Sequence, residues 1–481
     1  MKAFRWKAFG IILIWCIFVL VPATSAAVTQ ENTIVKVGEE RCELCLIKID
    51  MDDPCVRIDS VLAGESVGEQ KKLPQILKRV EKQGGQIIAA INGSYFEPDQ
   101  SGKTRLWSTL QRRGSFVHIG DFGTVMGVNG DGKLTFAHMV VKIIGRIKGE
   151  KDEQSFDVWG LNHSYIEDEA VAIFTSAYGK YTPEGERWAI TVENNRVIAI
   201  STGTVPISVN GFVVVTGSQE KVDLFQEGEQ VEYELAFVEA GRQDGYISGD
   251  SLDWSEMRTT VGAGPLLIKQ GVIVLDAVKE GFQEEEFVSE KALFRSFIGQ
   301  DMDGRLVLGV ARFVTLHELS QALLEEGLVE AMNLDGGISS SMMLGDESLV
   351  GPYRKITDAI VITRFDVPPV RVFINEQELF YETDPVIQNN RTLVPLAKTC
   401  KALGVNYTVN EDEERIQINK GNTTVSFTLG DTNVQVNGKD HLLDTAPFKT
   451  EEKIYIPLRF LAEVFDLQVI WHPSRQITLN N

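Results

Sequence analysis

The chain has 481 residues, of which 43% are hydrophobic and 24% charged, and its formal net charge at pH 7 is −21. This length predicts two or three domains, and the composition is ordinary for a folded soluble protein. The acidic balance argues against general nucleic-acid binding, because phosphate backbones would repel such a chain. It does not exclude a small anionic substrate, since one local arginine can outweigh the global charge at close range.

Residues 1–26 are predicted to form an export signal. Three basic residues precede an apolar run over 9–21, and small residues follow at 24–27. This order is typical of a secretory signal that is cleaved after Ala26 or Ala27, and an uncleaved membrane anchor is the alternative. The mature protein is therefore expected outside the cytoplasm, either secreted or in the cell envelope.

Cleavage of this signal would leave four cysteines, Cys42, Cys45, Cys55 and Cys400. An exported chain can form disulfides, but their pairing cannot be read from a sequence. The C-x-x-C of Cys42 and Cys45 is half of a zinc motif, and no second half completes it. A disulfide among the first three cysteines, or simply buried thiols, is expected rather than a metal site. No cofactor is predicted, and a requirement for a divalent metal is left open.

Two segments of the chain follow the same plan of helix, glycine, apolar strand and asparagine. After two strands expected within 45–64, an amphipathic helix around 73–80 leads to a strand over 87–93 that ends in Asn92 and Gly93. Later, Thr315 and Glu318 predict a capping box that opens a second helix, and a strand over 328–333 ends in Asn333. We expect both strands to deliver polar residues to one sheet edge, where ligands of α/β proteins commonly bind.

Further strands are predicted between and after these segments, at 187–201, 211–217, 231–240 and 305–313. With the two helices, they predict an α+β main domain of mixed β-sheets with packed helices over residues 27–366.

A second domain is predicted over residues 367–481, after a linker at Pro368-Pro369. Here "RTLVPLAKTCKALGV" is echoed by "KIYIPLRFLAEVFDL", and Pro395 and Pro457 occupy matching places. Each copy predicts a strand, an amphipathic helix and a hairpin, so this is expected to be a small α+β domain. It contains no convergent group of Asp, His or Arg, and a structural or adhesive role is expected.

The stretch "MNLDGGISSSMM" (332–343) carries the strongest chemical signal. Asp-Gly-Gly alone is explained by a tight turn between strands. Two glycines also let the backbone approach a ligand closely, and exposed N–H groups there can hold an anion. The serines could add hydroxyl donors, and Asp335 could act as a carboxylate catalyst or a sugar ligand.

This stretch resembles the signature of the phosphodiester glycosidase family. Four other blocks are similar to that family in the right order: "AAINGSYFEPD" (89–99), "VGAGPLLIKQG" (261–271), "RSFIGQDMDGRLVLGV" (295–310) and "YRKITDAIVI" (353–362). The resemblance covers 31–366, and it departs from the family at Ile338 and Ala263, where glycine is usual. Residues 370–481 resemble the copper amine oxidase N-terminal-like, or stalk, domain of exported bacterial proteins. Despite that name no copper is implied, since neither His441 nor His472 lies near other ligands.

The resemblance implies hydrolysis of a sugar-1-phosphodiester of the N-acetylglucosamine-1-phosphate type at its anomeric C–O bond. The leaving phosphate is already a stable anion, so it needs a cationic clamp more than it needs a proton. The expected catalytic residues are Asp335 as the carboxylate, Arg295 as the phosphate clamp and Asp301 as a second carboxylate. The expected substrate-binding residues are Asn92, Gly93, Gly264, Asn333, Gly336, Gly337, Ser339 and Ser340.

Several of these residues also have a structural alternative. Asn92 and Asn333 could cap strand ends, Arg295 could be a solvated strand-end arginine, and Asp301 could serve the turn of "DMDG". The expected partners are a phosphorylated glycan or a sugar-1-phosphodiester, with possible cell-wall attachment through the C-terminal domain and no nucleic acid.

Two other functions compete with this one. A non-catalytic glycan-binding protein could use the same fold. A serine hydrolase using Ser339 or Ser340 is disfavoured, because the chain lacks a G-x-S-x-G motif and an evident histidine partner.

Overall fold

The computed structural model describes residues 28–98, 104–120, 123–149, 153–164, 166–239, 254, 256–282, 290–410, 414–450 and 453–480. The predicted export signal lies outside these residues. Within them, no helix is long and apolar enough to cross a membrane.

The chain is mostly β, with 54% strand and 10% helix, so the predicted α+β class is wrong. The two helices predicted for the main domain are present but short: α1 spans Leu73–Val80 and α4 spans Leu316–Glu325. Most of the structure comes from strands, many of only two to six residues, that long-range pairing holds in sheets. Such pairing leaves little local signal in a sequence.

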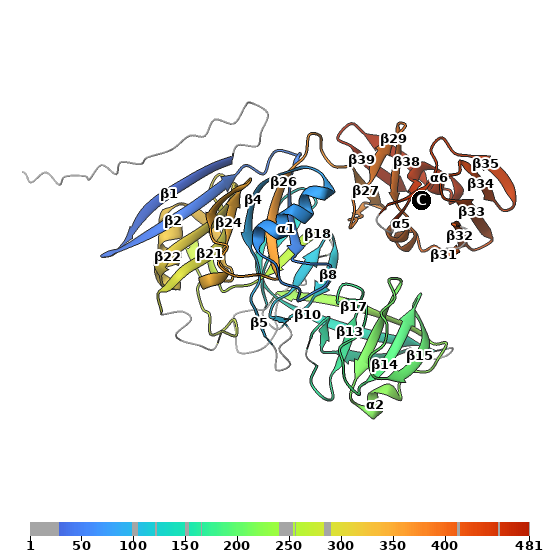
Figure 1. Cartoon of the computed structure of the whole chain (residues 1–481), viewed down its shortest axis with the longest axis horizontal. Helices are drawn as coiled ribbons and strands as arrows, with labels where there is room; N and C mark the ends of the chain where they lie inside the picture. Colours follow the sequence, from blue (N-terminus) through green and yellow to red (C-terminus); the bar gives the residue numbers. More distant parts are fainter. Residues whose placement is uncertain are drawn as a thin grey trace, which may run out of the picture.

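A seven-stranded antiparallel sheet forms one wall of the main body (Figure 1). In sheet order its strands are β1 (Val28–Val37), β2 (Glu40–Ile49), β22 (Leu306–Val314), β21 (Ala292–Asp301), β23 (Leu328–Asn333), β19 (Leu266–Lys269) and β20 (Val272–Ile273). Helix α4 packs against this sheet through Leu316, Leu319 and Leu323, which are fully buried. Its capping box is confirmed: Glu318 N donates to Thr315 Oγ1 at 3.1 Å, and Thr315 N donates to Glu318 Oε2 at 2.8 Å.

A five-stranded antiparallel sheet forms the opposing wall. Its strands are β25 (Glu347–Val350), β24 (Met342–Leu344), β4 (Gln86–Asn92), β26 (Asp358–Arg364) and β3 (Val56–Leu62). One hydrophobic core joins the two walls, since Ile47 and Leu308 of the first sheet share it with Ile91 and Ile360 of the second. Helix α1 covers the other face of this sheet, with Leu73, Ile76 and Leu77 buried.

A twelve-stranded sheet extends from this body into a separate lobe, which Figure 1 shows around β13, β14 and β15. Its strands are β12 (Gly160–Leu161), β13 (Val171–Phe174), β16 (Gly211–Thr216), β14 (Trp188–Glu193), β15 (Arg196–Thr202), β17 (Gln230–Glu239), β10 (Leu134–Lys148), β9 (Thr124–Asn129), β18 (Met257–Gly262), β7 (Leu110–Arg112) and β8 (Ser115–His118), with β11 (Glu153–Val158) beside β10. The predicted hairpin of β14 and β15 is present, and it turns at Asn194 and Asn195, both with positive φ. The short strands β5 (Phe96–Pro98) and β6 (Thr104–Leu106) pair with each other.

The C-terminal region contains the predicted repeat. Strand β30 (Arg391–Pro395) leads through Pro395 into α5 (Leu396–Ala402), and β37 (Lys453–Pro457) leads through Pro457 into α6 (Leu458–Val464). The two strands pair in a sheet of order β29 (Val386–Gln388), β30, β37, β36 (Phe448–Thr450). Each helix is followed by a hairpin, β31 (Asn406–Asn410) with β32 (Arg415–Lys420) and β38 (Gln468–His472) with β39 (Gln476–Asn480).

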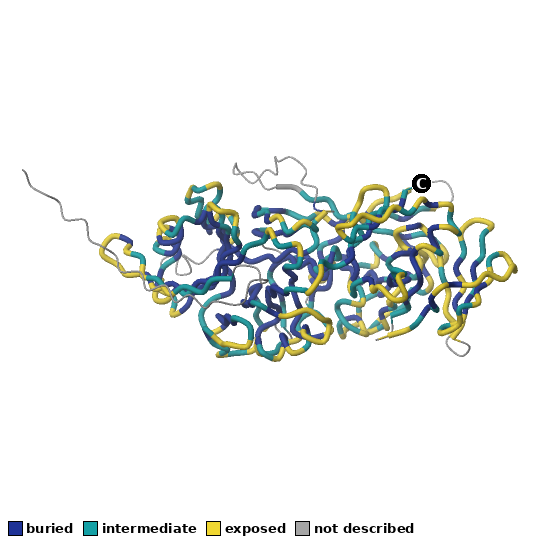
Figure 2. The backbone as a smooth tube through the Cα atoms, turned by 90° about the horizontal axis from the view of Figure 1, so that it is seen from above, coloured by how far each residue is buried: buried dark blue, intermediate teal, exposed yellow. Residues whose placement is uncertain are grey.

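The remaining strands of this region are β27 (Arg371–Ile374), β28 (Gln377–Glu378), β33 (Thr423–Thr428), β34 (Asn433–Val436) and β35 (Lys439–Leu442). The region has its own hydrophobic core, built from residues between Val370 and Leu479. Figure 2 shows buried segments gathered inside both halves of the molecule. The boundary between residues 366 and 367 remains a prediction.

All four cysteines among the described residues are free thiols. Cys42 and Cys400 are buried, and burial raises the pKa of the Cys400 thiol to about 12. A disulfide or unpaired thiols were expected for these cysteines, and the structure has unpaired thiols.

Candidate functional site

The two strands that end in asparagine belong to different sheets, but their ends meet. We expected one shared sheet edge; instead, β4 lies in the five-stranded sheet and β23 in the seven-stranded sheet. Asn92 Nδ2 donates to the carbonyl oxygen of Asp335 at 2.6 Å, and Asp335 N donates to the carbonyl oxygen of Gly93 at 3.1 Å. The loops after the two strands are thus fixed to each other where the two walls come together.

Asn92 is used by the protein itself rather than left open to a ligand. Its Oδ1 accepts from Ser296 Oγ at 2.9 Å and from Ser341 N at 3.1 Å, and its side chain is almost fully buried. Ser296 Oγ also lies 2.8 Å from Ser340 Oγ, and Ser340 is fully buried. These contacts of Asn92 and Ser340 position the Asp335 loop, and the expected role of both residues in substrate binding stays a prediction.

Asp335 is a buried carboxylate with unusual protonation. Its residue is only 9% exposed, and this burial raises the pKa of Asp335 to about 7. Hydrogen bonds from Ser339 and from the backbone of Gly336, together with the charge of Arg354, act in the opposite direction. The backbone N–H of Gly336 is thus hydrogen-bonded to the Asp335 carboxyl group. With a pKa of about 7, this carboxyl group can exchange a proton near neutral pH.

Arg354 is the cation in direct contact with Asp335. Its Nη2 lies 3.4 Å from Asp335 Oδ2, and its Cζ lies 4.3 Å from the centre of the Phe96 ring. The Arg354 side chain is 36% exposed, whereas that of Asp335 is 12% exposed. Arg354 is therefore placed between the buried carboxyl group and solvent, where an incoming anion could reach it.

Arg295 lies deeper in the same site. It is 5% exposed, its Nη2 donates to the carbonyl oxygen of Glu290 at 3.1 Å, and burial lowers its pKa. A Cβ on Gly336 would lie 3.8 Å from Arg295 Cα and 3.0 Å from the carbonyl oxygen of Phe294, so the glycine loop runs against this part of β21. The structural alternative of a solvated arginine does not hold, because Arg295 is buried.

Asn333 and Gly264 form a second connection beneath the Asp335 loop. Asn333 Nδ2 donates to the carbonyl oxygen of Gly264 at 3.0 Å, and Gly264 N donates back to the carbonyl oxygen of Asn333 at 2.8 Å. Tyr95 Oη donates to the same Gly264 carbonyl at 2.9 Å and also contacts Asn333 Nδ2. Among the described residues, the buried Asn333 Oδ1 has no hydrogen-bond partner. It is therefore the one amide oxygen of the two asparagines that remains available.

The glycines of the site are required for different reasons. A Cβ on Gly93 would lie 1.9 Å from Asp358 Oδ2, and one on Gly264, whose φ is +112°, would lie 2.9 Å from Thr124 Cβ. Gly337 has φ +59° and no atom within 4 Å of an added Cβ, so open space lies beside it. Gly93 and Gly264 allow close packing, whereas Gly337 leaves the loop open.

Asp301 does not join this group. It pairs with Leu328 at the far end of β23 from Asn333, five residues away, which corresponds to roughly 17 Å along a strand. Its carboxylate accepts from Arg305 N at 2.9 Å and from Arg305 Nε at 2.8 Å. The structure therefore places Asp301 in the turn of "DMDG", and we do not retain it in the proposed site.

Asp358 is a second carboxyl group of the site that was not predicted from the sequence. Asp358 is 1% exposed, accepts from Ser94 N at 3.0 Å and from Thr357 Oγ1 at 2.8 Å, and its negative charge contributes to the raised pKa of Asp335. Asp358 lies in the block 353–362 and is the acidic first residue of the otherwise mostly apolar strand β26. That position was the sequence signal that could have indicated a functional carboxyl group. The ring of Tyr95 is buried against Trp107 and Phe282.

Among the described residues, no group of three or more His, Cys, Asp and Glu side chains is arranged to hold a metal ion.

Comparison with protein families identifies two parts of the chain. Residues 187–363 match the phosphodiester glycosidase model, and residues 373–479 match the copper amine oxidase N-terminal domain model. The first match includes Gly264, Arg295, Asn333 and Asp335 but not the Asn92 block. No curated protein matches the chain.

Two solved structures share the fold at low sequence identity, and a third has a TM-score below 0.5. A protein from Synechocystis has a TM-score of 0.60 at 22% identity, over 70% of this chain and 62% of that protein, so this chain spans less than two thirds of its length. A protein from Burkholderia pseudomallei has a TM-score of 0.55 at 16% identity, over 67% of this chain and 74% of that protein. The catalytic domain of zebrafish N-acetylglucosamine-1-phosphodiester alpha-N-acetylglucosaminidase has a TM-score of 0.34 at 13% identity, over 71% of this chain and 85% of that domain. This chain thus combines a phosphodiester glycosidase family region with a copper amine oxidase N-terminal domain.

Proposed function

We propose that this protein is an exported hydrolase of a bacterial cell envelope, which cleaves a sugar-1-phosphodiester at the anomeric C–O bond. The observation that carries the proposal is the buried carboxyl group of Asp335. Its pKa is raised to about 7, and it lies 3.4 Å from Arg354 inside the region that matches the phosphodiester glycosidase family. The substrate expected from the family is of the N-acetylglucosamine-1-phosphate type.

In this reaction Asp335 acts as the general base. It takes a proton from a water molecule, whose oxygen attacks the anomeric carbon. The bond between that carbon and the phosphate oxygen then breaks, and its electron pair stays on the leaving phosphomonoester. A base with a pKa near the working pH combines a useful fraction of the charged form with a strong affinity for the proton.

The two arginines stabilise the leaving phosphate in this proposal. Arg354, which is partly exposed, meets the incoming diester, and Arg295, which is buried, opposes the negative charge that grows during bond cleavage. Since the phosphate leaves as a stable anion, no carboxylic acid has to protonate it. This explains how the site could work with Asp301 far away, and it favours a direct displacement with inversion at the anomeric carbon.

Hydrolysis of methyl (N-acetyl-α-glucosaminyl) phosphate in ¹⁸O-labelled water tests this proposal. Attack at the anomeric carbon puts the ¹⁸O into the sugar, whereas attack at phosphorus puts it into the phosphate. Mass spectrometry of the products distinguishes the two, and proton NMR during the first turnovers shows which anomer forms. The proposal expects labelled sugar in the β form. Labelled phosphate would contradict the proposed bond cleavage, and binding without any turnover would favour the non-catalytic glycan-binding alternative.

A further inference from the structure

A groove of about 360 Å³ lies on the C-terminal region, far along the chain from Asp335. It is lined by residues of β29 and β38, which are edge strands of two different four-stranded sheets, and by Leu458 at the start of α6. Figure 1 shows these elements in the upper right of the molecule. The volume lies in the range of small-molecule sites, which begins at about 300 Å³.

An exposed tryptophan forms one side of this groove. Trp471 is 47% exposed, and it is the one tryptophan among the described residues that counts as a large exposed hydrophobic residue. Ile387, which also lines the groove, is 42% exposed. Exposed aromatic and aliphatic surfaces that gather in a hollow are typical of binding sites, because covering them with a ligand is favourable. A flat indole ring suits the C–H face of a sugar ring.

Two arginines line the groove, and one of them is unpaired. Arg391 Nε lies 2.7 Å from Asp444 Oδ2, so this guanidinium is paired. Arg459 is exposed on the first turn of α6 and forms no ion pair or hydrogen bond with any described residue. One uncompensated guanidinium in a chain with a net charge of −21 is a local attraction for an anionic group. A guanidinium binds phosphate through two parallel hydrogen bonds.

A polar residue completes the groove beside these groups. Asn390 lies at the turn between β29 and β30 with φ +58°, and its side-chain amide can donate to or accept from a sugar hydroxyl. An apolar platform, an unpaired cation and an amide together match a sugar that carries a negative charge, and an apolar peptide would leave Arg459 unsatisfied.

We propose that this groove binds a phosphate-bearing glycan and so holds the polymer whose sugar-phosphate bonds the Asp335 site hydrolyses. The choice of phosphate as the anion rests on the proposed function, whereas binding at the groove rests on its own residues. A second site on the same chain raises the local concentration of the polymer at the first site, because the second binding event becomes intramolecular.

Binding is tested with the full chain carrying Asp335→Asn, which prevents turnover in the proposed mechanism. The probe is a synthetic poly(N-acetylglucosamine 1-phosphate), titrated by calorimetry. Trp471→Ala and Arg459→Gln should each weaken binding about tenfold, as expected for a central contact of an interface. Ile470→Ala and Arg415→Gln are the matched controls, since Ile470 points to the opposite face of β38 and Arg415 lies outside the groove. Both controls should bind as tightly as the parent.

The identity of the ligand is tested with polygalacturonate, which carries carboxylates, and with dextran, which is neutral. Both should bind about tenfold more weakly than the phosphate polymer. Equal affinity for either polymer would overturn the assignment of phosphate. Unchanged binding in Trp471→Ala and Arg459→Gln, with melting temperatures equal to that of the parent, would overturn the groove as the site.

Failure of this inference and failure of the proposed function give different results. In the chain with native Asp335, Trp471→Ala should leave hydrolysis of the small methyl phosphodiester unchanged and slow hydrolysis of the polymer. If the parent hydrolyses neither substrate but binding still depends on Trp471, the hydrolytic function is wrong and the groove stands. If both substrates are hydrolysed equally well by the parent and by Trp471→Ala, the groove plays no part.

Discussion

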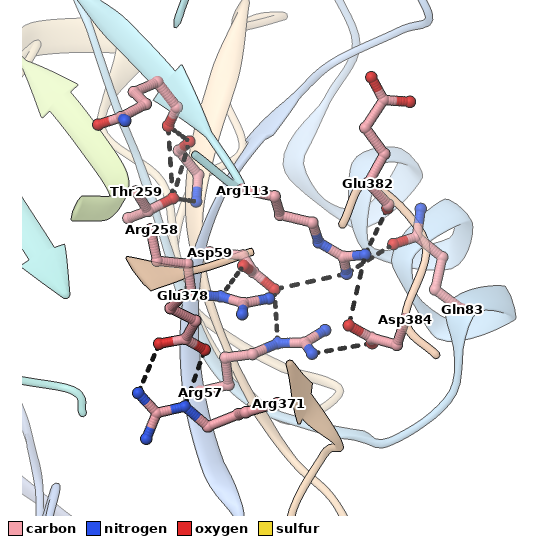
Figure 3. Close-up of polar contacts among 12 residues, drawn as sticks. Arg57, Asp59, Gln83, Arg113, Arg258, Thr259, Arg371, Glu378, Glu382 and Asp384 are labelled. Atoms are coloured by element: carbon pink, nitrogen blue, oxygen red, sulfur yellow. Dashed lines mark hydrogen bonds and ion pairs between the residues drawn. The ribbon is translucent and has the colours of Figure 1, made fainter. Parts of the chain in front are cut away.

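Arg57 of β3 and Asp384 of the C-terminal region form an ion pair with 2.8 Å between Nη1 and Oδ2. Arg57 Nε also lies 2.9 Å from Asp59 Oδ2, and Arg258 Nε lies 3.1 Å from Asp59 Oδ1 (Figure 3). Arg113 approaches both acids and donates to the carbonyl oxygen of Glu382. The C-terminal region therefore supplies one of the two carboxylates that neutralise three nearby guanidiniums of the main body.

Loss of Asp384 should destabilise the whole chain. Asp384→Ala leaves Arg57 and Arg113 buried with Asp59 as their remaining acid, and such uncompensated charge is costly. We expect the free energy of unfolding to fall by about 2–3 kcal/mol, less than for an enclosed pair because the Asp384 side chain is 27% exposed. Glu153→Ala, which removes an exposed partner of Arg146, is the control and should leave the urea midpoint unchanged. Equal midpoints for both variants would contradict this role of Asp384.

Removal of the C-terminal region is a second test of the same contact. The sequence predicts that residues 27–366 and 367–481 are two domains. We expect a fragment ending at residue 366 to melt at a lower temperature than the intact chain. In that fragment Asp59 alone of the two carboxylates is left to neutralise Arg57, Arg113 and Arg258. Asp384→Ala in the intact chain should reproduce part of that loss. A fragment that melts at the temperature of the intact chain would show that the two regions are energetically independent.

The pH dependence of hydrolysis should report the surroundings of Asp335. If the charged form is the general base, kcat/KM rises with pH through a midpoint near the Asp335 pKa of about 7. The positive charge of Arg354 lowers this pKa and the negative charge of Asp358 raises it. Arg354→Gln should therefore move the midpoint to higher pH, and Asp358→Asn should move it to lower pH. If the parent and both variants had the same pH profile, the group that titrates in kcat/KM would not be Asp335.

Arg354→Gln should also slow the reaction at high pH, where Asp335 is charged in both proteins. Loss of one strong electrostatic donor in an active site lowers kcat by on the order of 10²–10³. Arg364→Gln is the control, because Arg364 pairs with Asp53 at the other end of β26. Comparable rates for Arg354→Gln and Arg364→Gln above pH 9 would remove Arg354 from the proposed mechanism.

Asp301→Asn separates the turn role of Asp301 from the catalytic role that the sequence suggested. The variant keeps an acceptor for the backbone N–H groups of Asp303 and Arg305 and loses the charge that pairs with Arg305. We expect unfolding to become about 1–2 kcal/mol easier, as for the loss of a charged hydrogen bond, with kcat/KM unchanged. A large loss of activity at unchanged stability would return Asp301 to the list of catalytic residues.

Local signals in the sequence predicted local structure well. The side chains of Thr315 and Glu318 bond across three residues, and the proline before each C-terminal helix recurs at a fixed offset, so neither required knowledge of distant contacts. The prediction of one shared sheet edge failed because strand partners are chosen by tertiary packing. Nothing near Asn92 or Asn333 indicates that their strands lie in opposing sheets.

The chemistry of the site was predicted in part for the same reason. Asp335 follows the end of an apolar strand and Arg295 was expected from the family resemblance, and the structure brings them into one region. The contact of Arg354 with Asp335, the influence of Asp358 and the distance of Asp301 depend on how three strands of two sheets meet. Those relationships are absent from the spacing of residues along the chain.

The Asp335 carboxyl group should favour function at the expense of stability. Its folded pKa, about 7, lies above the ordinary value of 3.8, so its contribution to stability is complete below pH 4 and is lost as the pH rises through 7. The cost of keeping the charge buried at pH 8 is up to about 4 kcal/mol. Asp335→Asn removes that charge, so it should melt at or above the temperature of the parent at pH 8 and lose this advantage at pH 4.

The most direct test of the account is the rate of sugar-1-phosphodiester hydrolysis by Asp335→Asn at pH 8, measured on protein whose melting temperature has been determined in the same buffer. Asparagine keeps the size of the side chain but cannot accept the proton of the attacking water. We predict that turnover is abolished while the melting temperature is equal to or higher than that of the parent. Retained turnover in a stably folded Asp335→Asn protein would contradict it, because Asp335 would then be a residue of the turn alone.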